Sequence, residues 1–240
     1  MKIRRGCLFF LFIFIFVFIN STKVNAVNTG FITNQMSNEE KNTLISYMSI
    51  LPLDKEPIKK SVACFDVNSN HLIAIGQHTT GQKKIICVYS KEGLFQYGYA
   101  FNYNSDFGIE WDNENINIYL ARSSAVVSVT PTGEVIDIFE IQDTHKNYSY
   151  INHFIHATKR SVGNDEYIMR SNLGLLNIFA TSYSQIIVKD STGVENVIYD
   201  VSSKHLSSMI VTIVITCLFV LSVIVPIVWQ FIKLKHLKKT

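Results

Sequence analysis

The stretch that decides the fold is GIEWDNENINIYLARSSAVVSVTPTGEVIDIFEI, residues 108–141. It contains four short runs rich in Val, Ile, Tyr and Phe, residue types that are enriched in β-strands. Polar turns with Asn, Ser or Gly separate the runs, and Gly133 can supply the positive φ that a tight hairpin turn requires. The stretch therefore predicts four antiparallel strands joined by short turns.

Parts of this stretch recur elsewhere in the chain. Residues 116–119, Ile-Asn-Ile-Tyr, resemble residues 176–179, Leu-Asn-Ile-Phe, and Gly133 has a counterpart at Gly193. An earlier copy runs from Ile73 to Gly93. A recurring unit of this size predicts three four-stranded repeats. The predicted strands are 62–66, 72–76, 85–89 and 94–101 in the first unit, 108–111, 116–120, 125–129 and 135–141 in the second, and 166–170, 175–180, 185–188 and 195–200 in the third.

With these strand–turn–Gly–strand motifs, the predicted repeat domain at 61–206 resembles, over roughly 61–201, the blade repeats of NHL and TolB-like β-propellers. The resemblance implies an all-β domain of about three four-stranded, propeller-like blades, and it implies no particular activity. Three blades are fewer than the four to eight of a closed propeller. Either the N-terminal helix and the insert at 142–165, which can hold one more strand or a covering loop, cap an open stack, or two chains form a six-bladed ring as a homodimer.

A second decisive stretch is MIVTIVITCLFVLSVIVPIVWQF, residues 209–231, which has no charged side chain. As a helix it would be roughly 35 Å long, enough to cross a hydrocarbon core of about 30 Å. Four lysines follow it, whereas Lys204 and His205 are the only basic residues just before it. The positive-inside rule then predicts a single-pass type I protein of the cell membrane, with a transmembrane helix at 207–232, a cytoplasmic basic tail at 233–240 and the N-terminal domain outside.

The N-terminus has the composition of a secretory signal peptide. Residues 1–5 contain three basic side chains, residues 7–19 are apolar, and Val24-Asn25-Ala26 forms a small-residue cleavage site. We expect cleavage after Ala26; the alternative is an uncleaved anchor that gives a two-span hairpin. This arrangement, with repeats and one anchor, also resembles that of surface proteins of bacteria.

The segment 27–60 predicts a helix followed by a linker. Ser37-Asn38-Glu39-Glu40 has the form of a capping box, and apolar residues follow at helical spacing until Pro52. We expect a helix at about 38–50, with its apolar stripe against the β domain.

Charge content excludes one class of partner, and the cysteine positions predict the state of the thiols. Between Ala26 and Phe231 the chain carries 14 Lys and Arg against 19 Asp and Glu, a net charge of −5, so nucleic acid is not an expected partner. Cys64 and Cys87 fall on non-adjacent predicted strands, and we expect two buried free thiols rather than a disulfide. Asn147-Tyr148-Ser149 is an N-glycosylation acceptor sequence in a eukaryotic host.

Alternating aromatic residues form the first candidate binding site: Phe95, Tyr97, Tyr99, Phe101 and Tyr103. On one face of a regular strand they would stack on a sugar of a cell-surface glycan or on a protein partner. The alternative is that they pack one sheet against the next.

Two histidines of the insert, His153 and His156, form the second candidate site. Histidines and nearby acids can hold a metal, but on a strand these two would face opposite sides, so no metal site, cofactor or catalytic residue is predicted. The expected function is binding or protein interaction at the cell surface, with the lipid bilayer and a protein partner or second copy as contacts. An extracytoplasmic hydrolase and a structural accessory subunit of a membrane complex are the alternatives.

Overall fold

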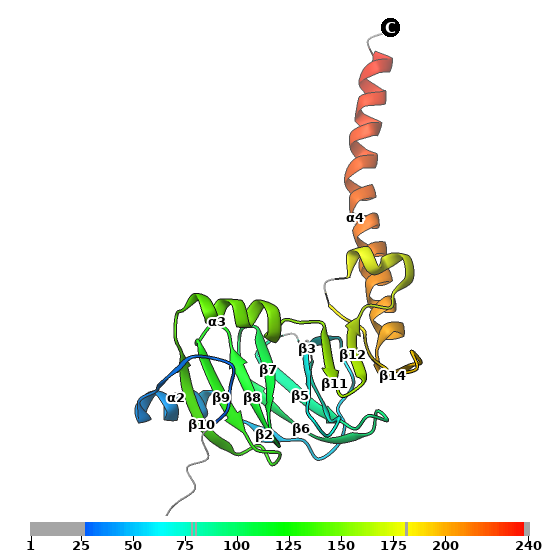
Figure 1. The fold of residues 1–240 in the computed structure, drawn as a ribbon. Helices are drawn as coiled ribbons and strands as arrows, with labels where there is room; N and C mark the ends of the chain where they lie inside the picture. The colour runs from blue at the N-terminus through cyan, green and yellow to red at the C-terminus, as the bar shows by residue number, and fades with distance from the viewer. Residues whose placement is uncertain (1–26, 78, 80, 181, 238–240) are drawn as a thin grey trace, which may run out of the picture.

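The computed structural model describes residues 27–237 except 78, 80 and 181, with backbone only for 179 and 227–237 (Figure 1). The predicted signal peptide at 1–26 lies outside the described residues. Within them, fourteen strands form three antiparallel sheets, and one long helix ends the chain (Figure 1). The predicted all-β domain with one C-terminal apolar helix is confirmed at this level.

The strands predicted for the first two units fall in one sheet each, and three of the four strands predicted for the third unit fall in another. The β3–β6 sheet has β2 at its edge, and the β7–β10 sheet has β1 at its edge. The strands of the first are β2 (Leu51–Pro52), β3 (Val62–Val67), β4 (Ile73–Gln77), β5 (Lys83–Tyr89) and β6 (Phe95–Asn102). Those of the second are β1 (Thr33–Gln35), β7 (Phe107–Asp112), β8 (Asn115–Leu120), β9 (Ala125–Val129) and β10 (Val135–Ile141). The β11–β14 sheet contains β11 (Lys159–Val162), β12 (Asp165–Arg170), β13 (Gln185–Lys189) and β14 (Glu195–Asp200).

The β3–β6 sheet is the middle layer of the domain. One of its faces packs on the β7–β10 sheet and the other on the β11–β14 sheet, which gives two separate hydrophobic clusters. Burial on both faces explains why β4 and β5 are nearly continuous apolar runs, Ile-Ala-Ile-Gly and Ile-Ile-Cys-Val-Tyr. The first strands of the three sheets, β3, β7 and β11, lie next to one another, with β3 between the other two.

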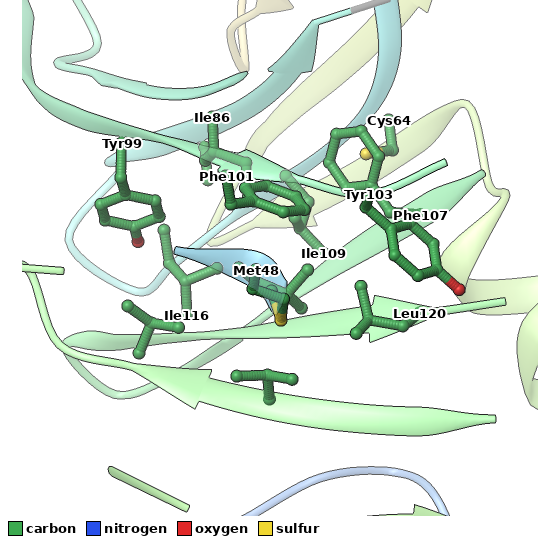
Figure 2. Packing of buried hydrophobic residues seen from close by; sticks show 14 of the residues in the cluster. Met48, Cys64, Ile86, Tyr99, Phe101, Tyr103, Phe107, Ile109, Ile116 and Leu120 are labelled. Carbon is green, nitrogen blue, oxygen red and sulfur yellow. The ribbon is translucent and has the colours of Figure 1, made fainter. Parts of the chain in front are cut away.

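The cluster between the first two sheets contains most of the alternating aromatic residues of β6 together with the residue after it, Tyr103. Tyr99, Phe101 and Tyr103 are buried there, and Figure 2 shows them beside Met48 and Ile116. The expectation that all five alternating aromatics share one face is wrong for Phe95, which packs into the opposite cluster. A β-bulge is the cause, because Val88 pairs with Tyr97 while the next residue, Tyr89, pairs with Phe95.

The N-terminal helix is confirmed as α2, Asn38–Met48. The Ser37 hydroxyl accepts a hydrogen bond from the Glu40 N–H, and the Glu40 carboxylate accepts one from the Ser37 N–H, which completes the predicted capping box. Met48 is fully buried in the cluster between the two sheets, as expected for the apolar stripe. The short strands on either side of the helix, β1 and β2, were not predicted; they pair with β10 and β6 and so cover an open edge of each sheet.

The insert between the second and third repeats is both a cover and a strand. Helix α3 (His145–Tyr150) continues into a π-helical turn, η1 (Ile151–Ile155), and β11 follows. Side chains of this helical segment pack with Phe31 on the outer face of the β7–β10 sheet. Both predicted roles of the insert, a covering segment and one more strand, are therefore present.

One predicted strand of the third repeat is wrong. Residues predicted as a strand at 175–180 form a 3₁₀ helix, η2 (Gly174–Phe179). Gly174 has φ +59°, which interrupts an extended chain, and the Asn177 side chain accepts a hydrogen bond from the Leu173 N–H at 2.7 Å. The matching Asn117 in β8 is instead buried in its sheet and donates to the Asn28 carbonyl. The fourth strand of this sheet is supplied by β11 from the insert.

The C-terminal helix, α4 (Ser202–Leu237), follows β14 after a single residue, Val201. Its segment Ser202–Pro226 is long and apolar enough to cross a membrane, and the 18-residue window that decides this has a mean hydropathy of 2.8. The large apolar side chains from Ile210 to Val225 are exposed, because the β domain does not cover them.

Candidate ligand pocket at the α4 edge

One end of the three sheets, which we call the α4 edge, collects the features that can bind a ligand. It is the end at which β3, β7 and β11 begin and at which β14 ends, so α4 leaves from it. Gln185 at the start of β13 pairs with Asp200 at the end of β14. Val62 at the start of β3 forms a β-bridge with Tyr183, just before β13. The start of β3 and the start of β13 therefore lie side by side at this edge.

A pocket of about 330 Å³ opens at this edge, where the three sheets meet. Its walls come from the starts of β3, β5 and β7, the end of β4, the residue after η1 and the segment before β13. The side chains that line it are mostly polar: Gln77, Thr79, Lys84, Asp106, His156, Ser182 and Tyr183, together with Val62, Ala63 and Phe107. A cavity of this size and lining suits a small polar group.

Gln77 is the most distinctive residue of the pocket. Its side chain is fully buried, and its Oε1 has no hydrogen-bond partner among the described residues. The amide Nε2 donates only to the Cys87 sulfur, at 3.5 Å. Burial raises the pKa of the Cys87 thiol to about 12, so this sulfur is a neutral and weak acceptor. A buried amide oxygen without a partner is costly, and a ligand that donates a hydrogen bond to it would remove that cost.

Charged groups are also present in the lining. Lys84 lies in β5 and Asp106 lies in the connection before β7, and neither forms an ion pair in the described part of the chain. Asp106, His156 and Ser182 are residue types of a hydrolytic triad. No hydrogen bond joins any two of these side chains in the described structure, however, and an activated nucleophile requires one.

The predicted site residues fall in different places. Tyr99, Phe101 and Tyr103 lie in the core and Tyr97 is half-buried against it, which agrees with the packing alternative. The Tyr103 hydroxyl accepts hydrogen bonds from the Arg122 and Ser123 N–H groups, at 2.8 and 3.1 Å, and so fixes the turn between β8 and β9.

The two histidines also separate. His153 is exposed on η1, where its Nδ1 lies 2.9 Å from the Ser149 carbonyl oxygen one turn earlier, whereas His156 lines the pocket. The residues that the structure describes contain no cluster of three His, Cys, Asp or Glu side chains that could hold a metal.

Sequence reasoning missed Gln77, Lys84 and Tyr183. The only local signal is that Gln77 ends the apolar run Ile73–Gln77. The pocket forms from segments up to about 120 positions apart, Val62 to Tyr183, and no local pattern connects them.

Comparison with known proteins adds no relative: the chain matches no family model, and no curated protein or solved structure is significantly similar to it.

Proposed function

We propose that this protein is a single-pass, membrane-anchored binding protein, in which α4 crosses the bilayer and the β domain lies on its outer side. The observation that carries the proposal is the direct connection of α4 to the domain. Only Val201 separates β14 from the helix, and the exposed apolar side chains begin at Ile210. A helix with such a surface is stable in lipid, and the short connection holds the α4 edge and its pocket toward the bilayer.

The proposed orientation of the membrane anchor follows from the distribution of charge along the chain. The basic tail after residue 232 is expected in the cytoplasm, and the β domain, with its net negative charge, outside. The pocket supports the binding part of the proposal, because Gln77 offers a buried acceptor and Lys84 and Asp106 form no ion pair among the described residues. A partner or ligand in or near the same membrane can reach this pocket from the space between domain and lipid.

We further propose that the domain is an open stack of three propeller-like blades that works as a monomer. The adjacent first strands support the blade arrangement. The outer face of the β7–β10 sheet is occupied by α3, η1 and Phe31. The other outer face of the stack carries the ion pairs Arg170–Glu195 and Lys159–Glu166. A six-bladed ring would have to displace these groups, so capping by the insert is favoured over a homodimer.

The test uses the full chain in its native membrane. Alkaline extraction should leave it in the pellet, and protease added outside should remove the β domain while sparing α4. A photo-crosslinking residue at Lys84 or His156 should then give adducts, whereas the same residue at Glu114 or Thr132, on turns at the opposite end of the sheets, should give none. Release by alkali refutes the anchor, and equal adducts from all four positions refute binding at the pocket.

A further inference from the structure

Basic side chains without an ion-pair partner gather at the α4 edge. Six of them lie on its connections or beside the start of α4 and make no ion pair in the described part of the chain: Lys60, Lys83, Lys84, Arg122, Lys146 and Lys204. The acidic residues of the same connections are Asp54, Glu56, Asp106, Asp143 and Asp200, of which Glu56 pairs with Lys59, so the unpaired basic side chains are in the majority. This edge is therefore positive, although the domain as a whole is negative.

The opposite ends of the sheets have the reverse charge. Their hairpin turns carry Glu92, Glu114, Glu134 and Asp190, while their lysines are Lys91 and Lys189, of which Lys91 is paired with Asp165. The domain thus has a positive edge on the side of α4 and a negative edge on the far side. Such a separation orients a protein at a charged surface.

A basic groove lies at the base of α4. It has a volume of about 380 Å³, and its lining contains three lysines and a histidine but no acidic residue: Lys59, Lys60, Ser61, Val201, Lys204, His205 and Ser208. Lys59 is held by Glu56 at 3.3 Å and lies over the rings of Tyr89 and Tyr199, whereas Lys60 and Lys204 have no ion-pair partner in the described chain. The Nδ1 atom of His205 is buried and unpartnered among the described residues. These groups suit a phosphate.

The groove lies at the height of lipid headgroups if α4 crosses the bilayer as proposed. The apolar run of α4 begins at Met209, seven residues after the helix starts, which is a rise of roughly 10 Å. The headgroup layer on each side of a bilayer is about 5–8 Å thick. The α4 edge therefore lies within reach of the headgroups without any change in the domain.

An exposed apolar segment projects from the same edge. The connection from β12 to β13 carries η2, whose Leu175 and Ile178 are 95% and 82% exposed. The Ser184 hydroxyl accepts a hydrogen bond from the Asn172 N–H at 2.8 Å and lies 3.0 Å from the Ser202 hydroxyl, so this connection is joined to the first residue of α4. Figure 1 shows η2, in yellow, extending past the edge of the sheet to the height of the first turns of α4.

We propose that the α4 edge is a lipid-binding surface, in which the basic groove holds the phosphate of an anionic phospholipid and Leu175 and Ile178 insert among the headgroups. The occupant is the bilayer that α4 crosses, so this inference rests on the proposed anchor. Charge complementarity selects anionic over zwitterionic lipid, and the apolar surface of α4 continues into η2. The domain then lies on the membrane instead of standing away from it.

The experiment measures lipid binding and depth on the full chain. Native mass spectrometry in mild detergent compares phosphatidylglycerol with phosphatidylcholine. For the double variant K60Q/K204Q we expect at least a tenfold loss of phosphatidylglycerol affinity. Each lysine near an anionic surface raises the binding affinity about fivefold, and the variant removes two. The matched control K91Q/K189Q, with the same charge change on the far edge, should stay within about twofold of the unaltered chain.

Depth is read from a fluorophore at I178C in a C217S background, in vesicles that contain phosphatidylglycerol and a spin-labelled lipid. We expect quenching at position 178 and none for E114C on the far edge. Alkaline extraction of the same vesicles first reports whether α4 is inserted. Loss of insertion refutes the anchor itself. With α4 inserted, an unquenched 178 label or equal binding of both lipids overturns the lipid-binding surface and leaves the anchor intact.

Discussion

Arg160 donates a hydrogen bond from Nε to Oδ1 of Asp66 at 2.7 Å, inside the protein where β3 and β11 lie together. The other carboxylate oxygen accepts from the Trp111 N–H in β7 at 2.8 Å, so one carboxylate joins all three sheets. The remaining nitrogens of the Arg160 guanidinium donate to the carbonyls of Lys159 and Phe154. Every polar atom of this buried pair is thus satisfied, which is the condition for keeping it in the interior.

Removing the cation should be costly. For R160M we expect a loss of about 3–5 kcal/mol in the free energy of unfolding at neutral pH, because a buried Asp66 carboxylate would remain without its partner. Urea unfolding of the full chain in mild detergent, followed by Trp111 fluorescence in a W229F background, measures it. The neighbouring exposed pair gives the control: K159M should cost less than about 1 kcal/mol. Equal losses of unfolding free energy for R160M and K159M would mean that the cost does not come from leaving the Asp66 carboxylate without its partner.

The same pair predicts a pH dependence. Burial raises the pKa of the Asp66 carboxyl above its usual value, although Arg160 and the Trp111 N–H act against this rise. A raised pKa in the folded state gives stability at low pH that is lost as the pH rises through that pKa. Without Arg160 the pKa should rise further, so the deficit of R160M should shrink as the pH falls from 7.5 to 4.5. A deficit that is constant over this range would assign it to packing alone.

Local sequence patterns were sufficient to predict most strands, because alternation of apolar residues and glycine turns are local properties. The prediction failed where pairing with a neighbouring strand decides the structure. Residues 176–179 resemble 116–119, yet only the earlier segment has a strand on each side of it, in the β7–β10 sheet. The later segment follows Gly174 and forms a helical turn, in which the Asn177 side chain accepts a hydrogen bond from the Leu173 N–H. The bulge that turns Phe95 to the other face depends on the register with β5, which strand composition does not encode.

The candidate site was less accessible to sequence reasoning than the fold. Lys60 and Lys204 are 144 positions apart and meet only because β14 ends beside the start of β3. The one pocket residue that the sequence did suggest, His156, was predicted as a binding residue together with His153, and nothing in the sequence connected it with the other residues of the pocket that it lines. Charge division by region placed the basic surplus in residues 1–26 and in the tail after Phe231, and it gave no sign of a positive edge on the acidic domain between them.

The two cysteines of the β domain should be inert in the folded protein. Cys64 and Cys87 are free and buried on opposite faces of the β3–β6 sheet, and burial raises the pKa of both thiols to about 12. At pH 8 almost none of either is thiolate, the reactive form. We expect no labelling by maleimide in C217S until urea is added, and rapid labelling of an added E114C in the same chain. Labelling of Cys64 or Cys87 at the rate of E114C would show that this sheet opens.

Gly108 should tolerate no side chain. A Cβ atom at this position of β7 would lie 2.1 Å from Cγ2 of Ile155 in η1, far closer than real contacts allow. We expect G108A to cost about 1–3 kcal/mol in the free energy of unfolding, as in other overpacked cores. The double variant G108A/I155A supplies the control, since I155A removes the clashing atom. Its loss should be smaller than the sum of the two single losses, and strict additivity would refute the contact.

Asn147 should be essential for docking the N-terminal segment. Its buried side chain accepts a hydrogen bond from the Ile32 N–H at 2.9 Å and donates to the carbonyls of Ile32 and Gln142, at 2.8 and 2.7 Å. N147D keeps the shape but loses both donors, which leaves two carbonyls facing a carboxylate, so we expect a loss of at least about 2 kcal/mol. Hydrogen exchange should also rise in β1, which follows Ile32 directly.

The exposed Asn152 in the same helical segment is the matched control, and N152D should change neither the free energy of unfolding nor the hydrogen exchange of β1.

The burial of Asn147 also affects the N-glycosylation acceptor sequence at 147–149. A glycan on Asn147 cannot fit between Ile32 and Gln142, so chains made in a eukaryotic secretory pathway should carry it only when this segment is undocked. Mass spectrometry of folded chains that showed full occupancy at Asn147, together with protected β1 amides, would contradict the docking role of this side chain.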